Sequence, residues 1–198
     1  MIRVFLSASV PLPDCDKKFA ETADVIAIRE AVKAVVGEVI PRGFLVFGGH
    51  PAITPLVARL LRTVGPESRG RFILYQSAFF SDRFGADNDD FIDVRIIPTV
   101  RRSRKLSLAR MRERMIKDNQ FDAGVFIGGM EGVLEEFELF KRAHPGTPVW
   151  PIASTGAAAK SVFEMTSSQR PELFAREMTY PKLFRTLLSE IGGAAETA

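Results

Sequence analysis

Glycine residues with the spacing of an anion-binding turn lie in the middle of the sequence. Gly128 and Gly129 directly follow the apolar run at residues 123–127, and Gly132 comes three residues later, where an amphipathic segment begins. A buried strand, a tight turn and a helix N-terminus in this order leave backbone N–H groups without an internal partner. These groups and the helix dipole attract anions, and glycine lets a phosphate approach the main chain. The stretch predicts a site for a phosphorylated ligand, although similar turns also occur where nothing binds.

Small residues also follow three other apolar segments. Residues 44–47 end at Gly48 and Gly49, residues 2–6 lead to Ser7 and Ser9, and residues 148–152 lead to Ser154, Thr155 and Gly156. Open α/β sheets bind ligands at the carboxyl ends of their strands, and right-handed crossovers bring such ends to one edge. We therefore expect the three glycine-containing turns to form one pocket. The strand at residues 123–127 is expected at the centre of the sheet, with the strand that begins at Ile2 beside it.

Other residue types that often do chemistry are sparse. His50 and His144 are far apart and Cys15 is the only cysteine, so we expect no metal site, no internal disulfide and no cofactor. For His50 an ordinary loop position is the simpler interpretation. The basic run at residues 101–105 has no interleaved aromatic residue, which favours a solvated loop over a nucleic-acid surface.

Strands and helices alternate along the chain that positions these turns. The expected strands cover residues 2–6, 44–47, 72–76, 94–97, 123–127 and 148–152. The expected helices cover about residues 25–39, 52–64, 107–119, 157–165 and 181–191, with one more after the central glycine turn that ends at His144. Residues 81–90 and 166–180 are expected to be loops. This order predicts an α/β fold of the Rossmann-like type, three layers α/β/α with a mostly parallel sheet.

Length and composition suit one globular domain. The 198 residues are 46% hydrophobic and 26% charged, and we expect a single domain at residues 1–192 with a disordered tail at 193–198. No apolar run is long enough to cross a membrane, and the N-terminal residues do not have the pattern of a secretory signal, which predicts a cytoplasmic protein. The net charge of +3 gives only a modest attraction for anionic ligands.

Taken together, several stretches resemble the SLOG superfamily, which includes the LOG cytokinin-activating phosphoribohydrolases. Ser7-Ala8-Ser9 is similar to the turn after the family's first strand, and Gly48-Gly49 to its second glycine turn. Residues 111–115 resemble a Met-His-Glu-Arg-Lys helix, and residues 128–136 resemble the phosphate turn and the glutamate that follows it. The sequence departs from the pattern where Glu131-Gly132 replaces Gly-Thr and where Arg112 replaces the histidine.

The resemblance implies roles for individual residues. It assigns the chemistry to Arg114 and to Glu135 or Glu136, and it makes Gly128 to Gly132 the holder of a phosphate. It also implies a homo-oligomer. Three alternatives follow: a sensor-like module that binds a nucleotide or NAD-derived ligand, a phosphoribohydrolase that cleaves an N-glycosidic bond, and a merely structural surface ion pair between Arg114 and Glu135. The altered phosphate turn favours the sensor, and Ser154 to Ala158 resemble a turn of that branch.

Overall fold

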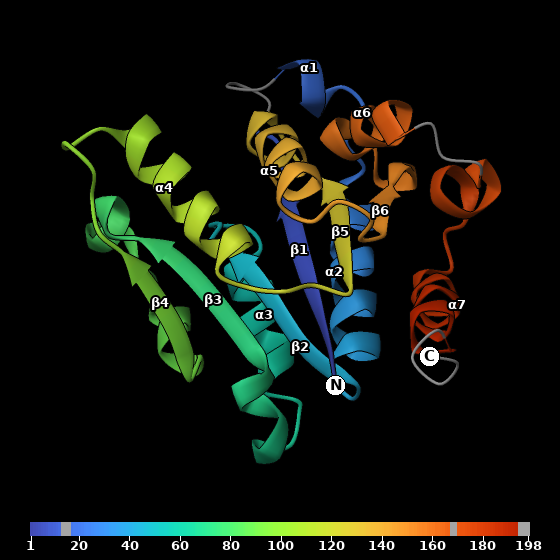
Figure 1. The fold of residues 1–198 in the computed structure, drawn as a ribbon, viewed down its shortest axis with the longest axis horizontal. Coiled ribbons are helices and arrows are strands. Elements are labelled where there is room, and N and C mark those ends of the chain that lie inside the picture. The colour runs from blue at the N-terminus through green and yellow to red at the C-terminus, as the bar shows by residue number, and fades with distance from the viewer. Residues whose placement is uncertain (13–16, 167–169, 194–198) are drawn as a thin grey trace.

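A six-stranded sheet, parallel throughout, forms the middle layer of the protein (Figure 1). The computed structural model describes residues 1–12, 17–166 and 170–193. The strand order is β4-β3-β2-β1-β5-β6. The strands are β1 (Ile2–Ser9), β2 (Gly43–Gly48), β3 (Phe72–Ser77), β4 (Asp93–Ile97), β5 (Ala123–Gly128) and β6 (Val149–Ile152). The predicted α/β class and Rossmann-like layers are confirmed. The expected central position of β5 is wrong, because β1 and β2 occupy the centre and β5 lies between β1 and the edge strand β6.

Helices cover both faces of the sheet. They are α1 (Lys17–Ala20), α2 (Val25–Val39), α3 (Thr54–Leu61), α4 (Arg104–Lys117), α5 (Glu131–Ala143), α6 (Ala157–Thr166) and α7 (Tyr180–Gly193). One core joins the sheet to α2, α3 and α7, and the other joins it to α1, α4, α5 and α6. Alternation along β1 supplies both cores, since Val4 and Leu6 face the first and Phe5 the second. The continuous apolar strands are therefore explained by burial on two faces.

The segments expected to be loops contain short helices. Residues 78–90 form two 3-10 helices, Ala78–Arg83 and Ala86–Asp90, and Arg62 pairs with Asp87 and Asp90 of the second at 2.9 and 2.5 Å. A single π-helical turn, Glu172–Arg176, lies within the other. Of the expected tail, Gly193 ends α7, and residues 194–198 lie outside the described residues, as does Cys15.

The chain reverses its winding direction between β1 and β5. From β1 it adds β2, β3 and β4 on one side, and α4 then carries it back to β5 on the other side of β1. Ser9 at the end of β1 lies opposite Gly128 at the end of β5. In open α/β sheets, the carboxyl edge at such a switch point is where ligands bind. Within the described ranges, no helix combines the length and the apolar character needed to cross a bilayer.

Candidate functional site

The first turn of α5 has free backbone donors at the switch point. Gly128 and Gly129 both have positive φ, 55° and 97°, which turns the chain sharply out of β5. The Gly129 N–H donates to the Ser9 carbonyl oxygen at 2.8 Å, and the N-cap residue Met130 makes no side-chain cap. Among the described residues, no acceptor receives the N–H groups of Met130, Glu131 or Gly132. Three donors and the positive end of a helix dipole therefore face outward from this turn.

The first turn of α3, in contrast, is closed by the protein itself. The His50 carbonyl accepts the N–H groups of Ile53 and Thr54 at 3.0 and 2.9 Å, and His50 Nδ1 accepts the Ala52 N–H at 3.2 Å. The Thr54 hydroxyl oxygen accepts the His50 N–H at 3.0 Å. His50 thus lies in the loop between β2 and α3, as expected, and it is half-buried there because its carbonyl oxygen and its ring bind the residues that begin α3. Burial lowers its pKa to about 4, so the imidazole is neutral at pH 7.

The first turn of α6 is closed as well. Ala157 N–H donates to the Thr22 hydroxyl at 3.1 Å, and Ala158 N–H donates to the Gly129 carbonyl at 3.3 Å. Gly156 permits this contact, because a Cβ there would lie 1.8 Å from the Thr22 carbonyl oxygen. Thr22 therefore occupies the place beside this turn where a ligand would approach.

The hydroxyl groups expected to contact a ligand after β6 also bind protein atoms. Thr155 is fully buried, donates to the Ile152 carbonyl at 2.6 Å and accepts the Gly128 N–H at 2.8 Å, which ties β6 to β5. Ser154 Oγ donates to the Glu177 carbonyl at 3.3 Å and lies 3.2 Å from the Tyr180 hydroxyl.

The glycines at the end of β2, Gly48 and Gly49, are in close contact with other side chains. Gly48 lies against Met111 and Met115 of α4, and the Gln76 side chain occupies the space beside Gly49. The expected turns therefore share one edge of the sheet. Among the described residues at these turns, three consecutive N–H groups without an acceptor occur at the start of α5, at Met130, Glu131 and Gly132.

A largely buried charge cluster lies beside that turn. Glu136 of α5 accepts a hydrogen bond from Ser7 Oγ at 2.6 Å and one from Arg112 Nε at 3.3 Å. The side chains of Arg112 and Glu136 are only 15% and 13% exposed. Arg112 also pairs through Nη1 with the half-exposed Glu135. Gly132 leaves room for this arrangement, because a Cβ there would lie 2.5 Å from Arg112 Nη2.

Burial and pairing act on Glu136 in opposite directions. Burial raises the pKa of its carboxyl group, whereas the charge of Arg112 and the hydrogen bonds from Ser7 and Arg112 lower it; burial prevails. Ser7, expected to contact a ligand, thus holds a carboxylate that the resemblance had named only as an alternative to Glu135.

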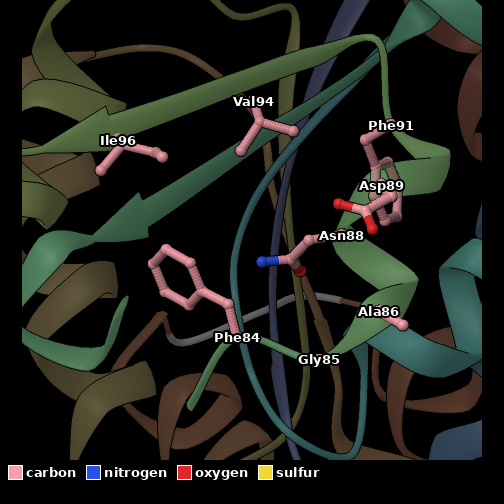
Figure 2. Close-up of a pocket in the computed structure, with 8 residues that line it drawn as sticks. All are labelled: Phe84, Gly85, Ala86, Asn88, Asp89, Phe91, Val94 and Ile96. Carbon is pink, nitrogen blue, oxygen red and sulfur yellow. The ribbon is translucent and has the colours of Figure 1, made fainter. Parts of the chain in front are cut away.

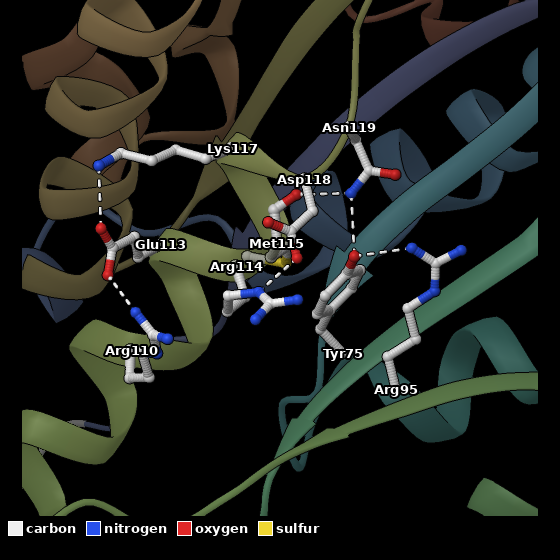
Figure 3. A network of polar contacts seen from close by, with 9 residues as sticks. All are labelled: Tyr75, Arg95, Arg110, Glu113, Arg114, Met115, Lys117, Asp118 and Asn119. Atoms are coloured by element: carbon white, nitrogen blue, oxygen red, sulfur yellow. Dashed lines mark hydrogen bonds and ion pairs between the residues drawn. The ribbon is translucent and has the colours of Figure 1, made fainter.

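Arg114 lies elsewhere on α4. It pairs with Asp118 one turn further along the helix and is half exposed, close to a second row in which Glu113 binds Arg110 and Lys117 (Figure 3). The possible ion pair between Arg114 and Glu135 is therefore not formed, and Arg112 takes that partner instead. The reason is helical phase, since residues 112 and 114 are about 200° apart around the axis.

A model of the SLOG cluster3 family matches residues 18–188 of this chain. The chain belongs to the SLOG cluster3 family. No curated protein and no solved structure matched it. Membership of this SLOG family supports a nucleotide-related ligand in general terms. The matched range includes β2 to β6 and all of the helix α5, but not β1, so Ser7 and Ser9 lie outside it.

The candidate site combines two kinds of chemistry within the first two turns of α5. Free N–H groups can bind a phosphate, and the paired carboxylates of Glu135 and Glu136 with Arg112 can bind hydroxyl groups or exchange a proton. Sequence reasoning missed Arg112 because it stands where the superfamily pattern has a histidine. The sequence did contain an indication of its position. Met111 and Met115 form the buried stripe of the helix, and residue 112 lies at the edge of that stripe.

Proposed function

We propose that this SLOG protein binds a nucleotide or NAD-derived phosphorylated ligand at the carboxyl edge between β1 and β5. The observation that carries the proposal is the first turn of α5, whose three unbound N–H groups lie at the switch point of the sheet. The ligand's phosphate accepts from Met130, Glu131 and Gly132. The Glu131 side chain is exposed, so water screens its charge from that phosphate.

The neighbouring charge cluster recognises the remainder of the ligand. The half-exposed Glu135 accepts hydrogen bonds from ribose hydroxyl groups at the rim of the site. Arg112 is held by Glu136 against Gly132, where its guanidinium adds positive charge next to the phosphate position. Ser7 fixes the other oxygen of Glu136. In this proposal the cluster is preorganised, so little side-chain entropy is lost when the ligand binds.

A second candidate function is hydrolysis of an N-glycosidic bond in a nucleoside 5′-monophosphate. The observation that favours it is Glu136 itself, a largely buried carboxyl group held by Ser7 and Arg112 whose pKa burial raises, because such a group takes up and releases a proton more readily than an exposed carboxylate. In that case Glu136 or Glu135 activates water or stabilises positive charge on the ribose, and Arg112 takes the role that the superfamily gives to an arginine. Binding without turnover remains our first proposal, since a glutamate and a glycine replace two residues of the hydrolase phosphate turn.

The direct test is a ligand screen. Nucleoside monophosphates, ADP-ribose and NAD are each added to the protein, the melting temperature is recorded, and the mixtures are chromatographed for a released base. We expect a rise in melting temperature without base release. Release of a base that is lost in Glu136→Gln would instead support the hydrolase, and the absence of any shift would contradict both functions.

A pair of variants at residue 131 tests the phosphate contact. Glu131→Pro removes one free N–H at the first helical position, where proline is well tolerated and no protein hydrogen bond is lost. Glu131→Ala removes the same carboxylate but keeps the N–H. We expect the proline variant to bind about tenfold more weakly or worse, the loss of one charge-assisted hydrogen bond. The alanine variant should bind at least as tightly as the wild type, and equal affinities in the two variants would refute the phosphate contact.

A further inference from the structure

The two edges of the sheet differ in how they are protected. At one edge, β6 is four residues long and contains Pro151, which cannot donate to an added strand. At the other edge, β4 has no proline between Asp93 and Ile97, and the sheet ends there (Figure 1). Isoleucines lie at both ends of β4, with Ile92 70% and Ile96 55% exposed. An open strand with exposed apolar residues is a surface on which another strand can pair.

A hollow of about 370 Å³ adjoins this open edge. Apolar side chains of Phe84, Phe91, Val94 and Ile96 line it, together with Asn88 (Figure 2). The Asn88 amide oxygen accepts from Gln76, whereas its nitrogen is buried with no hydrogen-bond partner among the described residues. Figure 2 shows that nitrogen directed between Phe84 and Val94. An apolar hollow with an unmet donor is suited to being covered by a second chain.

The residues of β4 are complementary to a second copy of themselves. Around Val94, Asp93 and Arg95 are one residue away on either side, and Ile92 and Ile96 are two residues away. In an antiparallel pair with its twofold axis at Val94, each Asp93 lies opposite the other copy's Arg95, and each Ile92 opposite the other copy's Ile96. An axis at Asp93 or at Arg95 would instead oppose like charges, which is unfavourable.

The charges of β4 do not prevent such pairing. Within one chain, Arg95 already binds Asp93 through two hydrogen bonds of 3.0 Å each. Charged residues protect a strand edge when they repel an incoming strand, but this pair is neutral as a unit. In the antiparallel pair the four groups alternate in sign around a square, so every neighbour is of opposite charge.

We propose that β4 forms the interface of a twofold-symmetric homodimer, in which two β4 strands pair antiparallel about Val94 and join the two sheets into one. The exposed isoleucines meet across the axis, and the side chains of the second copy cover the hollow at Phe84 and Asn88. The interface is isologous, so it closes at two copies. It shares no residue with the site at α5 and does not depend on a ligand.

Mass measured by light scattering over a range of protein concentrations tests this interface. We expect a dimer for the wild type. Ile96→Lys brings two charges into apolar contacts and should raise the dimer dissociation constant by roughly a hundredfold. The matched control is Ile26→Lys, since Ile26 on α2 is 76% exposed and lies away from β4, and it should remain dimeric. The double variant Ile92→Glu/Ile96→Lys places each introduced lysine opposite the other copy's introduced glutamate and should recover the dimer.

Cross-linking tests the register. In a Cys15→Ser background, Val94→Cys should form a covalent dimer under mild oxidation, whereas Ile26→Cys, at an exposed position on α2, should not. Circular dichroism verifies that each variant is folded. A wild type that is monomeric at every concentration would overturn the proposal. A dimer that survives Ile96→Lys and does not cross-link through Val94→Cys uses another surface, and it would overturn the proposal too.

Discussion

Arg112 and Arg114 illustrate what a step of two residues along a helix decides. Both flank the stripe of Met111 and Met115 that packs on the sheet, but on opposite sides of it, because two residues rotate the direction by about 200°. Only the side of Arg112 faces α5, where Glu135 and Glu136 lie. A motif match aligns letters, whereas the assignment of a role needs the direction of each side chain.

Alanine substitutions at Arg112 and Arg114 should differ in their effects on stability and on ligand binding. Arg112→Ala should lower the free energy of unfolding by about 1–3 kcal/mol, because it leaves the buried Glu136 without its cation. It should also weaken ligand binding. Arg114→Ala removes an exposed pair and should change stability by less than about 1 kcal/mol. Chemical denaturation and titration with the ligand from the screen measure both effects, and equal losses in the two variants would argue against the proposed site.

Protonation of His50 should make the protein less stable in acid. Burial lowers its pKa from 6.5 to about 4, so at pH values in between the unfolded chain binds a proton that the folded chain does not. The contribution of neutral His50 to the free energy of unfolding is complete above pH 6.5. It is lost as the pH falls toward 4, which lowers that free energy by about 2–3 kcal/mol. His50→Asn keeps an oxygen to accept the Ala52 N–H but does not titrate. Its melting temperature should therefore fall less between pH 7 and pH 4.5 than that of the wild type; parallel curves would disprove the assignment.

At the scale of elements, the positions of the turns could be predicted from the sequence. Whether the protein itself binds the N–H groups at each turn could not. Apolar runs followed by glycine mark β2 and β5 correctly, and glycine is what the positive φ of Gly129 requires. Whether a helix end is free depends on residues distant in the sequence. Thr22 reaches Ala157 across 135 residues, and Ser7 reaches Glu136 across 129. No local pattern contains those contacts.

The backbone conformation of the turn into α5 makes Gly129→Asp a poor test of phosphate binding. Aspartate at Gly129 would place a charge in the phosphate position, but Gly129 has a φ of 97°, and a Cβ there would lie 2.3 Å from Val133 Cγ2. Such a variant would fail through misfolding as readily as through lost binding. The proline at residue 131 removes a donor without either problem.

Alanine substitutions at two glycines with positive φ distinguish the cost of backbone strain from the cost of steric crowding. Gly156 has a φ of 70° with Thr22 against it, whereas Gly146 has a φ of 90° with open space around it. Gly146→Ala should cost about 1–2 kcal/mol of stability, the penalty of the left-handed conformation alone. Gly156→Ala adds displacement of the Thr22 backbone and should cost more, roughly 3 kcal/mol or above. Urea denaturation compares the two, and a Gly156 variant no less stable than the Gly146 variant would contradict the close packing.

At the scale of the whole molecule, two cores share one sheet. Strands such as β1 supply alternate residues to the two cores. Neither core can therefore lose its packing while the other keeps it. We therefore propose that residues 1–192 form one cooperative unit. The alternation of strands and helices was enough to predict this α/β architecture. The strand order could not be predicted, because the chain returns to the far side of β1 through α4. The composition of the sequence does not indicate this return.

Calorimetry tests the single unit. We expect one thermal transition whose calorimetric enthalpy equals its van't Hoff enthalpy. The measurement should be made on the Ile96→Lys variant, so that dissociation of a dimer does not add a second process. Two resolved transitions, or an enthalpy ratio well above one, would show that part of the chain unfolds independently.

The contact of Thr22 with the start of α6 has a consequence for the protein during its synthesis. The ribosome delivers β1 and α2 first, but β1 needs β5 as a neighbour, and Thr22 needs Ala157 as its donor. The earliest segment therefore cannot complete its contacts until most of the chain has emerged. Nascent chains stalled before residue 157 should remain sensitive to protease along their whole length, and chaperones that hold incomplete sheets should bind them longest. The residues that are synthesised first are therefore among the last to complete their contacts.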